Sequence, residues 1–128
     1  MSTPTIIVYG IPNCDTVRKA RAWLQDQCLA YQFHDFKKQG VPAERLSAWM
    51  AAVGWERLLN RRGTTWRRLD AAVQAGVDDA ASAAALMREQ PSVIKRPVVE
   101  WDGMATGRVT AGFEPDGWND LARAGSKQ

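Results

Sequence analysis

The first part of the chain carries a pattern of strand, helix and strand, which restricts the possible folds more than any other feature. An apolar run over residues 5–9 ends at Gly10-Ile11-Pro12, a helical pattern covers about residues 15–27, and Tyr31–Asp35 alternate as a second short strand. A helical crossover of this kind joins parallel strands, so the two strands are predicted to be parallel. We therefore expect a βαβ unit and a fold of the α/β class.

The later segments add a block of helices and then a hairpin. Pro42 stands where a helix begins and Gly54 where one ends, while Asp78 can cap an alanine-rich helix that Pro91 stops. The predicted elements are helices over 42–53 and 78–90, a short helical piece from Thr64 or Thr65 to residue 69, strands over 98–101 and 104–109 around the turn Asp102-Gly103, and a final helix over 115–122.

This order of elements fits a single domain over residues 1–128, since we find neither a linker nor an internal repeat. It predicts a thioredoxin-like α/β fold with a mixed four-stranded sheet, in the order βαβ and then ββα. The helices at about residues 42–90 form an insertion between the two halves. In such a fold, the proline that precedes the third strand can lie beside the start of the first helix.

Composition and charge exclude several classes of protein. Hydrophobic residues make up 45% of the chain and charged residues 24%, which is typical of a folded globular protein rather than a disordered one. A net charge of +3 is too small to predict nucleic-acid binding, but it is compatible with small anionic ligands. The N-terminal segment has no signal-peptide pattern and no long apolar span occurs, so we expect a cytoplasmic protein that does not bind a membrane. We also expect a monomer.

Cys14 is the strongest candidate for a reactive group, because it stands where the first helix begins. The first backbone N–H groups of a helix lack intrahelical partners and carry partial positive charge, so they stabilise a thiolate. Arg18 lies one turn further on the same helix face and can also lower the pKa, whereas the carboxylate of Asp15 opposes ionisation. We expect a thiol that is substantially ionised at neutral pH.

The second cysteine and the only histidine are interpreted as structural residues. Cys28 continues the apolar stripe of the first helix and is interpreted as a buried core thiol, about 20 Å along the helix from Cys14 and thus too far for a disulfide. His34 is interpreted as an ordinary, partly exposed strand residue. Two isolated cysteines and one histidine do not form a zinc-binding pattern, so no metal is predicted.

Cationic residues precede two of the predicted elements. Arg61 and Arg62 lie in the loop before Gly63, and Lys95-Arg96 directly precede Pro97 and the third strand. Guanidinium groups bind carboxylates and oxyanions through paired hydrogen bonds, which suits glutathione or an arsenate-type oxyanion near a thiolate.

Three segments together resemble a known family. They are YGIPNCDTVRKA at residues 9–20, LLNRRGTTW at residues 58–66 and IKRPV at residues 94–98. In this order and spacing they resemble the arsenate reductase (ArsC) family, specifically its YffB-like branch, which is related to the Spx regulators. The similarity extends from about residue 5 to residue 113. It implies a thioredoxin-like fold with a helical insertion, a catalytic cysteine at Cys14, anion-binding arginines at Arg62 and Arg96, and a cis peptide bond before Pro97.

The sequence departs from the family pattern at three places. Asp15 stands where arsenate reductases have glycine, and residues 109–112 lack the third arginine of those enzymes, because Arg108 is out of register. Both changes weaken binding of a multiply charged oxyanion. Spx-type redox switches carry Cys-x-x-Cys, whereas this chain has Val17 at the second position.

The resemblance and the residues together predict a glutathione-dependent thiol (disulfide) reductase with glutathione as co-substrate and without a metal or nucleotide. Its small substrate is a disulfide or an oxyanion, and nucleic acid is not an expected partner. The predicted site consists of the nucleophile Cys14 and the anion- or glutathione-binding residues Arg62, Arg96, Pro97, Asp15, Thr16 and Arg18. The alternatives are an arsenate reductase and an Spx-like, non-catalytic regulator that binds RNA polymerase.

Overall fold

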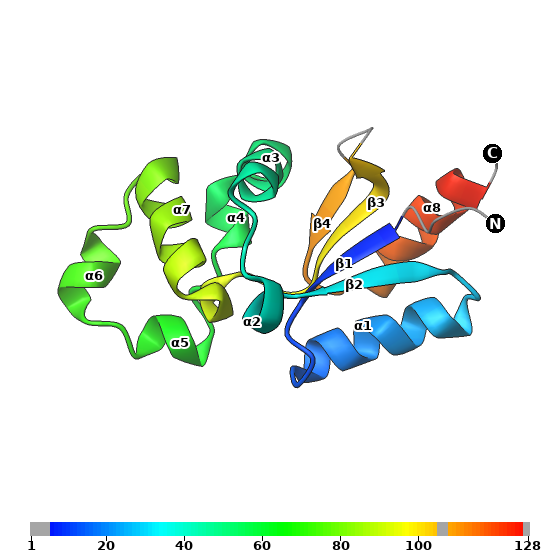
Figure 1. Ribbon diagram of the computed structural model, residues 1–128, viewed down its shortest axis with the longest axis horizontal. Helices are drawn as coiled ribbons and strands as arrows, with labels where there is room; N and C mark the ends of the chain where they lie inside the picture. The colour runs from blue at the N-terminus through cyan, green and yellow to red at the C-terminus, as the bar shows by residue number, and fades with distance from the viewer. Residues whose placement is uncertain (1–5, 105–107, 127–128) are drawn as a thin grey trace. The chain divides into compact units, whose positions relative to one another are not determined.

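The computed structural model describes residues 6–104 and 108–126, and the chain divides into two compact units. The first unit comprises residues 1–35 and 96–128, and the second comprises residues 36–95. The elements of the first unit are β1 (Ile6–Gly10), α1 (Asp15–Asp26), β2 (Tyr31–Asp35), β3 (Val98–Met104), β4 (Val109–Ala111) and α8 (Pro115–Ser126) (Figure 1). The predicted organisation as a single domain stays a prediction.

The first unit is built on a mixed four-stranded sheet with the strand order β2-β1-β3-β4. β1 and β2 are parallel, with Tyr9 opposite His34, which confirms the predicted βαβ unit. β3 runs antiparallel to both β1 and β4, and Val98 lies opposite Tyr9. The carboxyl end of β1 therefore lies beside the beginning of β3.

One face of this sheet carries the apolar core of the first unit. Alternate residues of β1 and β3 point to the same face, where they pack against α1 and α8. Trp118 of α8 is almost fully buried there, and its ring meets those of Trp23, Trp101 and Phe113 edge-on, at centroid distances of 5.6, 5.0 and 4.8 Å. The buried members of this core are Ile6, Val8, Ala20, Leu24, Val99, Trp101 and Trp118.

The opposite face carries a polar contact between the two central strands. The Tyr9 hydroxyl donates a hydrogen bond of 2.9 Å to Oε1 of Glu100, and both residues are buried. The ring of His34 lies against Tyr9, with 4.9 Å between the centroids. A buried carboxylate needs hydrogen-bond donors, and the Tyr9 hydroxyl supplies one of them.

The second unit consists of helices. They are α2 (Phe36–Gln39), α3 (Ala43–Val53), α4 (Trp55–Leu58), α5 (Thr64–Arg67), α6 (Ala71–Ala75), α7 (Ala80–Glu89) and the 3₁₀ helix η1 (Pro91–Val93). α3, α4 and η1 all contact α7, so this helix is central to the packing of the unit. No helix within the described ranges is long and apolar enough to cross a membrane.

The helix boundaries agree with the sequence where a strong terminator is present. α3 begins directly after Pro42 and ends at Gly54, whose φ of 88° suits glycine. Two predicted caps are wrong: Gly63, rather than Thr64 or Thr65, precedes α5, and Asp79, rather than Asp78, caps α7.

Asp79 succeeds as the cap because it can complete a reciprocal pair of hydrogen bonds. Its carboxylate accepts from the backbone N–H of Ser82 at 2.8 Å, and the Ser82 hydroxyl accepts from the backbone N–H of Asp79 at 3.2 Å. The short helices α4 and α6 were absent from the sequence prediction. The final helix reaches Ser126 and is thus longer than predicted.

The predicted hairpin turn at Asp102-Gly103 is wrong, because β3 continues through both residues to Met104. Glu100 pairs with Val109, and the N–H of Trp101 donates to the carbonyl of Arg108 at 3.0 Å. The strand thus continues through the dipeptide that favours a turn. The part of the predicted second strand at residues 105–107 lies outside the described residues.

Candidate active site

Cys14 occupies the N-cap position of α1, as the sequence predicts. Its backbone is extended, with φ of −98° and ψ of 128°, and its carbonyl accepts the first helical hydrogen bond from the N–H of Arg18 at 2.9 Å. The N–H of Cys14 donates to the carbonyl of Ile11 at 3.3 Å, which closes the turn between β1 and α1. The side chain of Cys14 is half-buried, so its sulfur is partly shielded from water.

Close packing of the helix against the strand fixes this turn. A Cβ atom at Gly10 would lie 2.9 Å from Cγ2 of Val17, which is fully buried. Real Cβ atoms essentially never approach another atom so closely. Only glycine at position 10 therefore allows the first turn of α1 to lie directly against the end of β1.

Burial raises the pKa of the Cys14 thiol, but the groups around the sulfur outweigh this effect. The backbone N–H of Val17, the Arg96 side chain through its hydrogen bond and its charge, and the backbone N–H of Thr16 stabilise the thiolate. Together they hold the pKa of Cys14 below its ordinary value of 9.0. The direction agrees with the expectation from the helix N-terminus.

Arg96 and Pro97 reach the site from the other central strand. Because Tyr9 pairs with Val98, the two residues that precede β3 lie next to the end of β1. The peptide bond between Arg96 and Pro97 is cis, as the resemblance implies. The carbonyl of Pro97 accepts a hydrogen bond from the N–H of Gly112 at 2.9 Å, which fixes this segment to the residue after β4.

The arginine that acts on Cys14 is Arg96 and not Arg18. Arg18 forms an ion pair with Asp15 one helical turn earlier, and both side chains are largely exposed. The carboxylate that was expected to oppose ionisation is thus paired with the cation that was expected to favour it. Thr16 contributes its backbone N–H group.

Arg62 belongs to the second unit, where it is exposed in the loop before α5. Its backbone N–H donates to Oδ1 of Asn60 at 3.3 Å, and the N–H of Asn60 donates to the carbonyl of Val93 at 2.7 Å. These bonds fix the backbone of the loop to η1. A role for Arg62 beside the thiol stays a prediction.

Arg108 is turned toward α8 rather than toward the thiol. Its Nη1 donates to the carbonyl of Leu121 at 3.4 Å, while its own carbonyl pairs with Trp101. Pro97 directly precedes β3, whereas Trp101 lies in the middle of this strand. Arg108 therefore pairs with a part of β3 that is distant from Pro97. The side chain is therefore not placed as a third cation of the Cys14 site.

The interpretation of Cys28 as a buried core thiol is wrong. α1 ends at Asp26, and Cys28 lies beyond its C-terminus, exposed and with a positive φ of 57°. The helical stripe ends at Leu24 because the chain leaves the helix before another apolar position is reached. Cys14 and Cys28 thus stand at opposite ends of α1.

Sequence reasoning identified the nucleophile but missed the groups that support it. The backbone N–H of Val17 is one of the unpaired donors of the first helical turn, and capping geometry alone could have indicated it. The contact of Gly10 with Val17 requires the packed structure. Within the described residues, no three His, Cys, Asp or Glu side chains come together as a candidate metal site.

The comparisons with known proteins agree with this geometry. Residues 9–121 match the ArsC family. The solved structure of a YFFB protein is 48% identical, covers 91% of this chain and 98% of its own, and superposes with a TM-score of 0.84. An arsenate reductase (ArsC) related protein from Brucella melitensis is 47% identical over 94% of this chain and 96% of its own, with a TM-score of 0.70.

Curated relatives extend this likeness to uncharacterised and regulatory proteins. An uncharacterized protein from Haemophilus influenzae is 42% identical over 100 residues, which cover 78% of this chain and 87% of that protein. The global transcriptional regulator Spx from Streptococcus agalactiae is 26% identical over 113 residues, covering 87% of this chain and 78% of the regulator. The predicted thioredoxin-like fold and the predicted kinship with YffB and Spx are confirmed.

Proposed function

The chain belongs to the ArsC family, and we propose that it is a thiol oxidoreductase in which Cys14 and glutathione reduce mixed disulfides. One observation carries this proposal: a half-buried cysteine at a helix N-terminus has a lowered pKa and an arginine beside its sulfur. A thiolate in this setting is the attacking species of thiol–disulfide exchange. The glutathione dependence rests on the family resemblance and on the cationic surroundings of the thiol.

The proposed reaction proceeds through two exchange steps. The Cys14 thiolate attacks the glutathione sulfur of a mixed disulfide, so that the enzyme becomes glutathionylated and the substrate leaves as a thiolate that takes up a proton. A second glutathione thiolate attacks the glutathione sulfur of this intermediate. Oxidised glutathione is released, and the Cys14 thiolate is regenerated. The mixed disulfide and one glutathione thus give the substrate thiol and oxidised glutathione, so one glutathione is consumed in each turnover.

The residues around Cys14 have distinct roles in this scheme. The N–H groups of Thr16 and Val17 and the Arg96 guanidinium stabilise the thiolate as nucleophile and again as leaving group. The Arg96 side chain can also hold a glutathione carboxylate, as can Arg62. The backbone before Pro97 would pair with the glutathione peptide.

Arsenate reduction is the second candidate, because one relative at 47% identity is described as related to arsenate reductase. The charges favour a disulfide instead. Arg96 supplies the cation that acts on Cys14, while Arg18 is paired with Asp15 and Arg108 is bonded to α8. A multiply charged oxyanion needs more positive charge than this at its binding site.

An Spx-like regulatory role is the third candidate, favoured by the relatives that are named as transcriptional regulators. In that case the chain would bind RNA polymerase without using its thiol. Stoichiometric capture of RNA polymerase that is unchanged by Cys14→Ala would support this role, and it would contradict the reductase as the main activity.

The decisive assay measures glutathione-dependent reduction of a small mixed disulfide by a Cys28→Ala variant. The same variant with the additional change Cys14→Ala is the blank, because the two proteins differ in the proposed nucleophile alone. We expect turnover that disappears completely in the blank. Equal rates in the two proteins would refute the mechanism, and reduction of arsenate without reduction of the disulfide would favour the second candidate.

Arg62→Ala tests the proposed role of this arginine in binding glutathione. We expect a higher KM for glutathione with little change in the reactivity of Cys14 toward a neutral alkylating reagent, because Arg62 is assigned to the carboxylate and not to the sulfur. Arg88→Ala, which removes an exposed arginine from α7, serves as the matched control. An unchanged KM in Arg62→Ala would show that this arginine is not part of the binding site.

A further inference from the structure

The positive charge of the chain is concentrated in one short segment. The chain has 17 Lys and Arg against 14 Asp and Glu, which gives +3. Residues 55–68 contain five arginines and one acid, Glu56, so this segment alone carries +4 and the rest of the chain carries −1. The mild basicity of the whole protein thus conceals a strongly basic region in a slightly acidic remainder.

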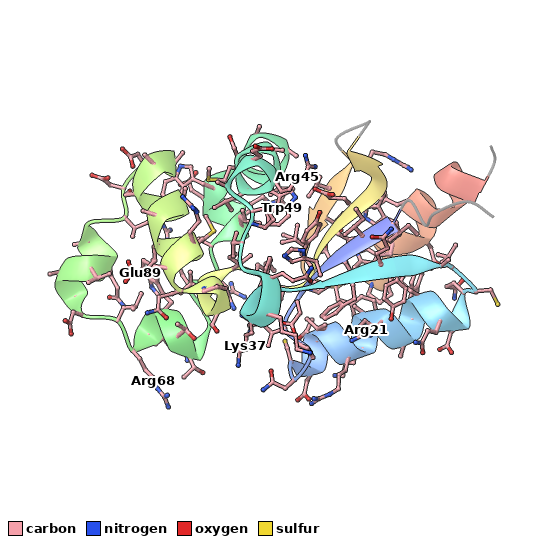
Figure 2. All side chains as sticks on the ribbon, viewed as in Figure 1. Arg21, Lys37, Arg45, Trp49, Arg68 and Glu89 are labelled. Atoms are coloured by element: carbon pink, nitrogen blue, oxygen red, sulfur yellow. The ribbon has the colours of Figure 1, made fainter. Side chains whose placement is uncertain are left out.

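The arginines of this segment are exposed. Arg57 lies in α4, Arg67 ends α5 and Arg68 follows it, and all three are exposed, as are Arg61 and Arg62. Figure 2 shows the Arg68 side chain extending from the end of α5 away from the neighbouring helices. None of these five arginines forms an ion pair with another residue in the described ranges.

Arg61 connects the two short helices that carry the other arginines. Its guanidinium carbon lies 5.6 Å from the centroid of the Trp55 ring in α4 and 5.8 Å from that of Trp66 in α5. Both distances are within the range of a cation–π contact. The start of α4 and the middle of α5 are therefore held close together. We call Arg57, Arg61, Arg62, Arg67 and Arg68 the arginine surface.

We infer that the arginine surface binds an acidic polypeptide segment of a partner protein. Like charges that gather without counter-charges repel one another, and a carboxylate-rich partner relieves this repulsion. The segment contains arginine and no lysine, and the planar guanidinium binds carboxylates through two parallel hydrogen bonds.

A nucleic acid fits this surface less well. Single strands bind by stacking their bases on open aromatic rings as well as by phosphate contacts. Here both indoles are half-buried and already have the Arg61 guanidinium over their rings, so little ring surface remains for a base. The charges are therefore available to a partner, whereas the aromatic rings are largely occupied.

This inference does not depend on the proposed reductase function, and the test can be done without the nucleophile. The full chain with Cys14→Ser is titrated against a fluorescent glutamate-rich peptide at low and at physiological salt. The test variant carries Arg57→Gln, Arg67→Gln and Arg68→Gln, which leaves Arg62 and the Arg61 contacts in place. The control carries Lys19→Gln, Lys38→Gln and Arg88→Gln, three exposed cations outside the surface. Circular dichroism confirms that both variants are folded.

We expect the peptide to bind, and to bind more weakly at higher salt. The test variant should lose affinity by roughly 5- to 100-fold, because each exposed charge pair contributes a modest amount, while the control stays within about twofold. Three results would overturn the inference: no binding of the peptide at low salt, equal losses in the two variants, or tighter binding of a single-stranded RNA of equal charge.

Discussion

Two loops of this protein, one in each unit, carry its chemically active residues, and they differ in how far they shield these residues from water. The turn over residues 10–14 is packed against a buried valine and half-buries a thiol, whose pKa then depends on its neighbours. The loop over residues 60–63 has a fixed backbone but directs its arginines to solvent. A thiol needs such an environment because its charge state is adjustable, whereas a guanidinium is charged everywhere. The first unit adjusts reactivity, and the second presents fixed charge.

The largest expected effect is the loss of the aromatic core in the first unit. Trp118→Ala should reduce the free energy of unfolding by about 3–5 kcal/mol, because this nearly buried ring contacts three other aromatic rings. Urea denaturation followed by circular dichroism measures the change. Trp66→Ala in the second unit is the comparison, and it should cost less because Trp66 is only half-buried. Equal losses would contradict this contrast between the two regions.

Substitution of one glycine in each loop by alanine compares how tightly the two loops are packed. Gly10→Ala should cost about 1–3 kcal/mol of stability, because its Cβ meets the buried, branched side chain of Val17. The displaced helix start should also raise the pKa of Cys14. Gly63→Ala should cost less than Gly10→Ala, because the atom it meets at 2.8 Å is the terminal amide nitrogen of Asn60, and this side chain can turn away at the cost of its hydrogen bond with the Arg62 N–H. Thermal and urea unfolding of both variants decide the point, and a Gly63→Ala variant as unstable as Gly10→Ala would refute it.

Removal of the Arg96 charge tests how the first unit lowers the pKa of the Cys14 thiol. Arg96→Gln should raise the pKa of Cys14, because the hydrogen bond and the positive charge of Arg96 favour the thiolate. The rate of alkylation rises with pH as the thiol ionises, so its midpoint should move to higher pH in the variant. Lys95→Gln removes the neighbouring exposed cation and should leave the midpoint unchanged. A shift of the same size in both variants would mean that net charge, and not contact, controls the thiol.

The smallest effect concerns a helix cap in the second unit. The backbone N–H of Ser82, and then its hydroxyl, hold the pKa of Asp79 below its ordinary value of 3.8. A lowered folded-state pKa means that the carboxylate stabilises the fold above the unfolded-state value and loses this effect as the pH falls through the folded-state value. Asp79→Ala should therefore lower the melting temperature slightly at neutral pH and have no effect in strong acid. Asp78→Ala, at the neighbouring position, should have a smaller effect at neutral pH, and the reverse order would identify Asp78 as the cap.

The sequence predicts those features that depend on local signals. Periodicity and capping signals predict three of these features: the strand at residues 31–35, the helix between Pro42 and Gly54, and the position of Cys14 at a helix N-terminus. The family resemblance predicts the cis peptide bond before Pro97, whereas local sequence statistics do not. Helices α4 and α6 span too few residues to show a helical period, so they escaped prediction.

The remaining features depend on contacts between segments that are distant in sequence. Arg96 acts on Cys14 because β3 pairs with β1, and no local pattern reveals that Arg18 would be paired with Asp15 instead. The turn signal at Asp102-Gly103 was overridden by the pairing of Glu100 with Val109. Tertiary structure thus selected both the cation beside the thiol and the register of the hairpin.

The central claim is that the first unit holds Cys14 as a readily ionised thiol. Its most direct test is a titration of thiolate absorbance in a Cys28→Ala variant, with Cys14→Ser added to that variant as the blank. We predict a midpoint for Cys14 below the ordinary pKa of 9.0. A midpoint at or above 9.0 would show that burial outweighs the donors and the charge of Arg96, and it would contradict the account.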